Sequence, residues 1–499
     1  MVRLLMAALL LAPTIPLTIA PVASVAQNLP TLGDTERESL SPLMERKLGE
    51  QIMHDIRRDR DYIDDGPVQE YLNNFGLNLV AVRPEVRGEA GYDFFFFMVR
   101  DPMLNAFALP GGFIGVHSGL VLASQSESEL AGVLSHEIGH VAQRHIARML
   151  GQQKQNSMIQ LAAIVLGALA GVSKAGGDAA MATMMGGTGL AIQRQLNFSR
   201  DAEREADRIG LQIMRDGGFD PSGMVTFFGR LQTASRSFSD AVPPYLLTHP
   251  LTTERIADIE GRIRDQRYRQ RVDNPDFHLA RARIRVLQND SVQGLREANE
   301  YFSNQLRQNT KQQVMSAKYG LAYVAYRQGN FDKADIYLEE ARAAAQPMAP
   351  SMMIVSLDID IKIGKKQAQA ALKEADAMRK QFPLSRVLTR QYASALIAAR
   401  RYDEAVAFLR DQTQLYRQEV QLQDLLAQAY AAQGRQALQH LALAESYALS
   451  GSLPAALEQL TIARRAPDAT FYDQSLIDAR ERDWKERWKE EMKESKERG

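Results

Sequence analysis

Residues 126–150 read SESELAGVLSHEIGHVAQRHIARML, and this stretch decides how the first half of the chain is interpreted. Ser126 followed by Glu129 is typical of a helix N-terminus, because the hydroxyl and the carboxylate can accept hydrogen bonds from the first free N–H groups. Apolar residues then recur at the spacing of a helix with one buried side: Leu130, Val133, Leu134, Val141 and Ile146. The pattern predicts one helix over 126–150, with His136 and His140 on the same face because positions four apart are neighbours.

His136, Glu137 and His140 form the motif HExxH in the middle of that helix. Two imidazoles on one helical face can bind one zinc ion, and a catalytic zinc takes three protein ligands and keeps one position for water. The glutamate is then placed to take the proton of a water that attacks a carbonyl. The alternative is a surface helix with two histidines. It is weakened by the scarcity of histidine, eight residues in 499, and by the amphipathic pattern around the motif.

A third zinc ligand has to come from elsewhere in the chain. One class of sites uses a histidine ten residues after the first, but Ile146 stands there and His145 is one residue short. We therefore expect His145 on the helix surface or behind a ligand. Another class uses a glutamate from a separate helix, and residues 199–207, SRDAEREAD, offer one.

Glu203 and Asp207 lie four residues apart, so a helix places both on one face. Glu203 can complete a zinc triad, and Asp207 can accept the free N–H of a ligating histidine and fix its tautomer. The alternative is that these carboxylates are solvated, as is expected for Glu205. The intact HExxH upstream favours Glu203 as the third ligand.

The composition limits the class of protein. With 499 residues the chain is long enough for about two to four domains. Lys plus Arg and Asp plus Glu number 60 each, and this balance argues against a nucleic-acid binder, which normally carries a basic excess. The absence of cysteine excludes thiolate ligands for zinc, disulfides and a lipid anchor on an N-terminal cysteine.

Residues 1–26 are expected to be a secretory signal peptide. A single charge, Arg3, precedes the apolar run Leu4–Leu11, and residues 24–26 (SVA) offer small side chains for cleavage, so Gln27 is the expected mature start. A membrane anchor is the alternative, but prolines interrupt the apolar stretch, which is short for a span of about 20 residues. We therefore expect an exported protein.

Two other parts of the first half have distinctive compositions. Tyr92–Met98 predicts a strand, and Asn105–Leu109 and Phe113–His117 predict two strands, or one bent strand, around a Pro-Gly-Gly turn. Residues 157–190 are apolar and then rich in Met and Gly. They predict either a buried helical hairpin or a flap that meets a membrane or a partner.

The second half is rich in helix-forming residues and repetitive. Tetratricopeptide repeats have a period of about 34 residues and small residues where paired helices touch. Ala334 and Ala405 are 71 residues apart, close to two such periods. Further positions fit the same pattern: Ala322, Gly329, Leu338, Ala341, Ala393, Leu409, Ala444, Gly451, Ala456, Leu460, Ala463 and Pro467. Because one helix pair cannot bury its apolar face alone, the pairs are expected to stack into a solenoid.

These observations predict a chain of two folded parts. An α+β zincin-like metalloprotease domain, mainly helical with a small sheet, is expected at 27–270, and an all-α solenoid of tetratricopeptide-like repeats at 275–470. The boundary is placed in the polar segment 264–277, which contains a proline. Residues 471–499 form a densely charged tail that is either a solvated helix or disordered.

HEIGH, followed by SRxxExxAD, resembles the HtpX and CAAX-prenyl-protease group of gluzincin metallopeptidases. Its soluble, exported, repeat-bearing branch is more similar still, since the signal, the NAFALPGG segment, the metal motifs, THP and the repeats match over nearly the whole chain. The metal motifs are specific to the group, whereas the repeats occur in many proteins. The resemblance implies one Zn²⁺ per chain held by His136, His140 and Glu203, with Glu137 as the catalytic base and Asp207 supporting a ligand.

The resemblance also draws attention to His249, in Thr248-His249-Pro250, with Arg255 a few residues further on. In the repeat-bearing branch a histidine of this motif can close onto the zinc and silence the enzyme. Two alternatives stay open for His249. It can stabilise the oxyanion of the reaction, or it can make a structural hydrogen bond in a loop.

The same branch implies a function. It implies a periplasmic zinc endopeptidase that degrades misfolded or misassembled outer-membrane proteins and supports β-barrel assembly in a chaperone-like manner. An unfolded substrate would add as a strand to Asn105–Leu109, residues 157–190 would plug the active site near the membrane, and the repeats would dock the β-barrel assembly machinery. One rival is a chaperone without enzymatic activity, against which the intact Glu137 argues. The other is an integral-membrane prenyl protease, which needs several spans of about 20 apolar residues.

Overall fold

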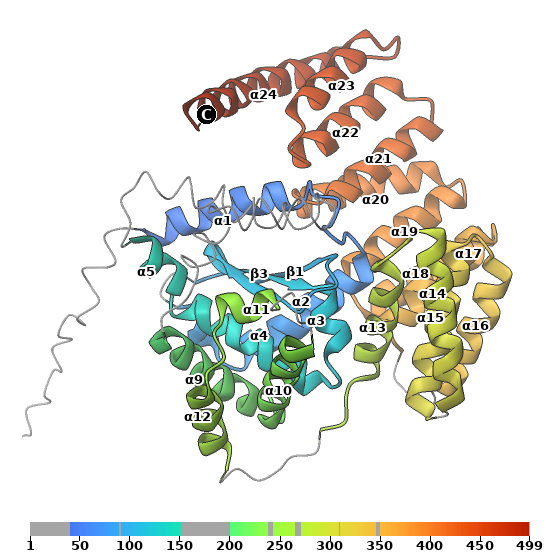
Figure 1. The fold of residues 1–499 in the computed structure, drawn as a ribbon. Helices are drawn as coiled ribbons and strands as arrows, with labels where there is room; N and C mark the ends of the chain where they lie inside the picture. Colours follow the sequence, from blue (N-terminus) through green and yellow to red (C-terminus); the bar gives the residue numbers. More distant parts are fainter. Residues whose placement is uncertain are drawn as a thin grey trace, which may run out of the picture.

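The computed structural model describes residues 40–88, 91–151, 200–237, 243–264, 271–308, 310–345 and 350–498. The expected signal peptide, the start at Gln27 and the apolar segment 157–190 lie outside these residues. The chain forms a mainly helical unit with one small sheet, followed by a stacked array of helices along one side of it (Figure 1). This arrangement confirms the predicted fold class.

Three strands form the sheet: β1 (Phe95–Val99), β2 (Ala106–Leu109) and β3 (Phe113–His117). Their order is β1-β3-β2, with β3 parallel to β1 and antiparallel to β2. The short 3-10 turn η3 (Pro110–Gly112) joins β2 to β3, and Gly111 has a φ of 80°, which glycine adopts without steric cost. The predicted strands are therefore present, and β2 lies at an edge of the sheet.

The helix expected over 126–150 is two helices, α4 (Glu127–Ala142) and α5 (His145–Gly151). Ser126 caps α4 as predicted, since its hydroxyl accepts from the N–H of Glu129. The break falls at Arg144, which has a φ of 51°. Its guanidinium donates to the Glu45 carboxylate and to the Leu40 carbonyl, so a contact with the N-terminal helix, distant in sequence, overrides the local helical pattern.

Further helices accompany α4 in the first part of the chain. They are α1 (Pro42–Ile56), α2 (Gly66–Ala81), η2 (Pro84–Arg87), α3 (Ser118–Ala123), α9 (Arg200–Asp216), α10 (Ser222–Ser237), α11 (Pro244–Thr248) and α12 (Thr253–Ile263). Glycines let α9 lie very close to α4. A Cβ on Gly210 of α9 would be 3.1 Å from the backbone nitrogen of His136. This close approach sets the separation of the side chains that the two helices direct toward each other.

The second half consists of paired helices joined by short turns. The helices are α13 (Pro275–Leu287), α14 (Val292–Gln305), η4 (Leu306–Gln308), α15 (Lys311–Arg327), α16 (Phe331–Ala344), α17 (Met352–Gly364), α18 (Ala368–Gln381), α19 (Arg386–Ala398), α20 (Tyr402–Leu415), α21 (Val420–Ala432), α22 (Gln436–Leu449) and α23 (Leu453–Arg465). Lys366, Arg400 and Gly434 each occupy the same place in a turn, have positive φ and follow one another at intervals of 34 residues. The repeat period predicted from the sequence is therefore visible in the backbone.

The charged tail is a helix, α24 (Phe471–Arg498). Ile477 and Trp484 are buried against α23, while most of its other described residues are exposed. Of the two alternatives left by the sequence, the helix is correct for the described part of the tail. No described helix combines the length and the apolar character that a membrane crossing requires.

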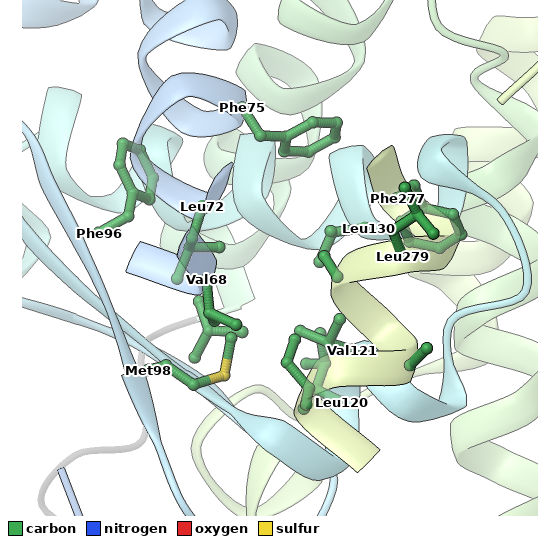
Figure 2. Close-up of a cluster of buried hydrophobic side chains, with 14 of the residues drawn as sticks. Val68, Leu72, Phe75, Phe96, Met98, Leu120, Val121, Leu130, Phe277 and Leu279 are labelled. Atoms are coloured by element: carbon green, nitrogen blue, oxygen red, sulfur yellow. The ribbon is translucent and has the colours of Figure 1, made fainter. Parts of the chain in front are cut away.

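One hydrophobic cluster spans the first part of the chain and the first helices of the array. In Figure 2, Val68, Leu72 and Phe75 of α2 belong to the same cluster as Phe277 and Leu279 of α13. The cluster continues into α15, α16 and α17. The first helices of the array thus share their apolar surface with the part of the chain that contains the sheet.

Polar contacts fix the array to α2 at several points. Arg283 of α13 is buried and makes a bidentate ion pair with Asp65, the N-cap of α2, at 2.8 and 2.9 Å. Glu70 accepts from the Ser385 hydroxyl at 3.0 Å and from the Val387 N–H at 3.2 Å, and so caps α19. Because these contacts join residues more than 200 positions apart, they fix where the array lies relative to the sheet.

Candidate metal centre

His136 and His140 of α4 and Glu203 of α9 direct their side chains to one point between the two helices. The two Nε2 atoms are 3.0 Å apart. Glu203 Oε2 lies 3.4 Å from His136 Nε2, and Glu203 Oε1 lies 3.3 Å from His140 Nε2. All three residues are buried.

These separations suit a zinc ion. Ligand atoms about 2.0–2.1 Å from a tetrahedral zinc lie roughly 3.3 Å from one another. Two imidazoles and one carboxylate are also a donor set of a catalytic zinc site, in which three protein ligands leave a position open. The residues therefore fit zinc in both chemistry and spacing.

His249, which follows α11, lies beside the same point. Its Nδ1 atom is 3.0 Å from Glu203 Oε1 and 3.4 Å from His136 Nε2, and its Nε2 atom is 3.6 Å from Glu137 Oε1. The imidazole is buried and stacks on Tyr245 with a centroid distance of 4.6 Å. His249 thus occupies the side of the cluster where a fourth ligand would be.

Glu137 is buried, and its carboxylate is approached by the backbone of Ala108 in β2 and by His249 Nε2. Burial raises the pKa of this carboxyl above its usual value. A fully buried carboxylate costs stability because it is desolvated, so natural proteins retain one mainly where it has a task. Its position beside the histidine cluster fits a group that accepts a proton during a reaction.

Asp207 and Arg255 hold the cluster from behind. Asp207 Oδ1 lies 2.9 Å from His136 Nδ1, and the Arg255 guanidinium donates to both Asp207 oxygens at 2.8 Å. The same guanidinium lies 2.6 Å from Glu203 Oε2. Burial alone would raise the pKa of the Asp207 carboxyl, but His136 and Arg255 hold it below its usual range. Sequence reasoning assigned no role to Arg255, because a lone arginine in a polar helix carries no local signal.

His145 and Glu205 lie on the other side of the cluster. His145 Nδ1 is 2.9 Å from His140 Nδ1, and His145 Nε2 is 3.2 Å from Glu205 Oε2. Glu205 also accepts from Arg148 at 3.2 Å. Glu205, which was expected to be solvated, is partly exposed and also contacts His145, since the break after α4 turns His145 toward α9. Of the two places expected for His145, the one behind a ligand is correct.

The structure thus brings together all six residues singled out from the sequence, His136, Glu137, His140, Glu203, Asp207 and His249. The edge strand β2 packs against α4 next to them.

Comparison with known proteins agrees with this geometry. The model of Peptidase family M48 matches residues 71–263, which contain the whole cluster. The β-barrel assembly-enhancing protease of Escherichia coli (strain K12) is 33% identical over 481 residues, covering 95% of this chain and 95% of that protein. The chain belongs to the β-barrel assembly-enhancing protease family. A member from Yersinia pestis is 33% identical over 457 residues, 91% of this chain and 90% of that protein.

Other relatives match over a shorter part of the chain. The mitochondrial metalloendopeptidase OMA1 of Schizosaccharomyces pombe is 33% identical over 194 residues, 39% of this chain and 52% of that protein. As a member of the β-barrel assembly-enhancing protease family, with an M48 peptidase region, the chain is a zinc metalloendopeptidase.

Proposed function

We propose that this protein hydrolyses peptide bonds of misfolded or misassembled outer-membrane proteins in the periplasm, with His136, His140 and Glu203 holding one zinc ion and Glu137 acting as the base. The observation that carries the proposal is the buried Glu137 carboxylate beside three ligand groups at tetrahedral spacing. The name of the E. coli relative, a β-barrel assembly-enhancing protease, supports the class of substrate.

When bound, zinc supplies Lewis-acid polarisation of the scissile carbonyl and of the attacking water. Glu137 accepts a proton from that water as the oxygen bonds to the carbonyl carbon, and delivers it to the amine nitrogen as the C–N bond breaks. Burial favours the first transfer, because a desolvated carboxylate is a stronger base than one in water. Asp207 keeps His136 in one tautomer, with its Nδ1–H directed at the carboxylate.

The edge strand β2 is proposed to position the substrate. Its outer edge, which pairs with no strand among the described residues, can pair with an extended segment of an unfolded polypeptide through main-chain hydrogen bonds. Because β2 packs against α4, such a segment would run next to Glu137. Unassembled β-barrel strands are polypeptides of this kind, which agrees with the proposed substrates.

His249 is proposed to act as a gate. In the described arrangement its Nδ1 atom lies at the distance from Glu203 and His136 expected of a fourth ligand. An imidazole in that position competes with water and substrate, so hydrolysis would require His249 to move. The alternative role, stabilisation of the oxyanion, predicts the opposite effect of removing it.

The proposal assigns a separate role to each region of the chain. Residues 27–270 act as the peptidase and residues 275–470 as the region that docks the β-barrel assembly machinery, with residues 471–499 as a tail. Residues 1–26 direct export to the periplasm and are then cleaved off. Residues 157–190 contact the membrane surface. The 34-residue helical period supports a docking role for the second region, because stacked helix pairs present an extended surface to a partner.

The first test compares three proteins without residues 1–26: the natural sequence, Glu137→Gln and His249→Ala. Zinc content and casein hydrolysis are measured side by side. We expect one zinc ion in each protein. Cleavage should be lost in Glu137→Gln and raised in His249→Ala. Lowered cleavage in His249→Ala would favour the oxyanion role. Zinc without cleavage in any of the three would favour a chaperone, and no bound zinc would overturn the ligand assignment.

A further inference from the structure

The two histidines of the motif are supported in different ways. His136 Nδ1 lies against a carboxylate, Asp207, at 2.9 Å. His140 Nδ1 lies against a second imidazole, that of His145, also at 2.9 Å. His145 is 4% exposed, and only its placement at the first position of α5, directly after the break at Arg144, brings it to this point.

The proton positions in this contact follow from chemistry. If His140 uses Nε2 toward the metal, its remaining proton is on Nδ1 and is donated to His145 Nδ1. His145 must then accept at Nδ1 and carry its own proton on Nε2. That atom faces Glu205 Oε2 at 3.2 Å, which accepts it. Each of the two contacts therefore has one donor and one acceptor.

Glu205 is held in place by arginine. Arg148 Nη2 lies 3.2 Å from Glu205 Oε2 and also donates to the Gln143 carbonyl at 2.6 Å, in the turn between α4 and α5. The side chain of Glu205 is 30% exposed, so this chain of contacts runs from the protein surface to the metal cluster. The turn that interrupts the helix and the carboxylate that orients His145 are thus fixed by the same arginine.

We propose that His145 and Glu205 are positioning residues for zinc binding, which hold His140 in the tautomer and ring orientation that a metal ligand needs. The proposal rests on the proposed role of His140 as a ligand. It makes α9 the source of support for both histidines, since Asp207 contacts His136 directly and Glu205 acts on His140 through His145. Groups that orient a metal-binding histidine typically contribute roughly 10- to 100-fold to metal affinity.

The test measures the zinc dissociation constant by competition with a chelator, on the whole chain without residues 1–26. His145→Phe keeps a ring in the pocket but removes both nitrogens, and we expect zinc to bind roughly 10- to 100-fold more weakly. Glu205→Ala is expected to weaken binding about 10-fold. His145→Asn offers an amide oxygen that can accept from His140 and should recover part of the loss. Asp201→Ala removes an exposed carboxylate from the same helix and should leave affinity unchanged.

The melting temperature of the zinc-free protein distinguishes a positioning role from a purely structural one. If Glu205 positions His140, zinc-free Glu205→Ala should melt close to the zinc-free natural sequence. Added zinc should then raise its melting temperature less than that of the natural sequence. Zinc affinities within twofold of the natural sequence for both His145→Phe and Glu205→Ala would overturn the inference, provided that His140→Ala loses zinc. Undiminished affinity in His140→Ala would instead overturn the ligand assignment on which the inference rests.

Discussion

Gly139 of α4 and Ala206 of α9 lie in backbone contact. A Cβ on Gly139 would be 3.0 Å from both the Cα and the carbonyl oxygen of Ala206. Gly139 is the residue before His140, and Ala206 comes three residues after Glu203. The contact therefore sets the distance between the helix that carries both histidines and the helix that carries the carboxylate.

We expect Gly139→Ala to weaken zinc binding by at least about 10-fold, because the added methyl group meets backbone and must push α9 away from α4. The zinc dissociation constant and the melting temperature measure the effect. Gly229→Ala is the matched control, since its Cβ would meet nothing within 4 Å in α10. The control should retain zinc affinity and melt no lower than the natural sequence. Equal zinc affinity in the two variants would contradict this account.

Arg255 neutralises two buried carboxylates, and Arg255→Met would leave Glu203 and Asp207 without that charge. We expect a loss of about 3–5 kcal/mol in the free energy of unfolding of the zinc-free protein. Urea unfolding measures it. Arg255→Lys should not restore stability, because an ammonium cannot make the paired contacts of a planar guanidinium. Arg204→Met, which removes a half-exposed arginine of α9, is the control, and an equal loss there would discount the buried network.

Asp65→Ala removes both the cap of α2 and the partner of the buried Arg283. The expected loss is again about 3–5 kcal/mol, since a buried guanidinium is left unpaired. Because the pair joins the sheet-bearing part to the array, the natural sequence should lose peptidase activity and helical circular dichroism over the same urea range. Asp201→Ala, which removes an exposed carboxylate of α9, is the control. An unchanged midpoint in Asp65→Ala would show that the pair does not connect the two parts.

Asp360 of α17 makes the free energy of unfolding depend on pH. Burial raises the pKa of its carboxyl from 3.8 to about 6. The folded state therefore binds more protons than the unfolded state between these values, and stability falls as pH rises through this window. Asp360→Asn removes the cost of the partly buried charge and should stabilise the protein by roughly 1–2 kcal/mol at pH 7.5 but not at pH 4. Urea unfolding at both pH values measures the difference, and a gain of equal size at pH 4 would exclude this cause.

The features that the sequence predicted are those with a local signal. HExxH and the acidic pattern at Glu203 and Asp207 are recognised by their spacing along a helix. The strands are recognised by short apolar runs between turn residues. The repeat period is local as well, since each unit repeats the same pattern. For these features neighbouring residues carry enough information.

The features that the sequence did not predict depend on contacts between distant segments. Nothing near Arg144 marks the end of α4, because the cause is Glu45 and Leu40 at the N-terminal end. The contact of Glu205 with His145 follows from that break, and Arg255 gains its role only when α12 reaches α9. Each of these side chains looks like an ordinary surface residue in its own helix.

The attachment of the array to α2 has a consequence for how this family can change length in evolution. Repeat arrays commonly gain and lose units by duplication, because each unit contacts only its neighbours. Here Arg283 and Ser385 both contact α2, so an inserted unit between them would separate Glu70 from α19. Gly451 lies against His54 of α1, which fixes a further point of the array. Helix pairs can therefore be added without disturbing these contacts only beyond Gly451, towards the C-terminal end.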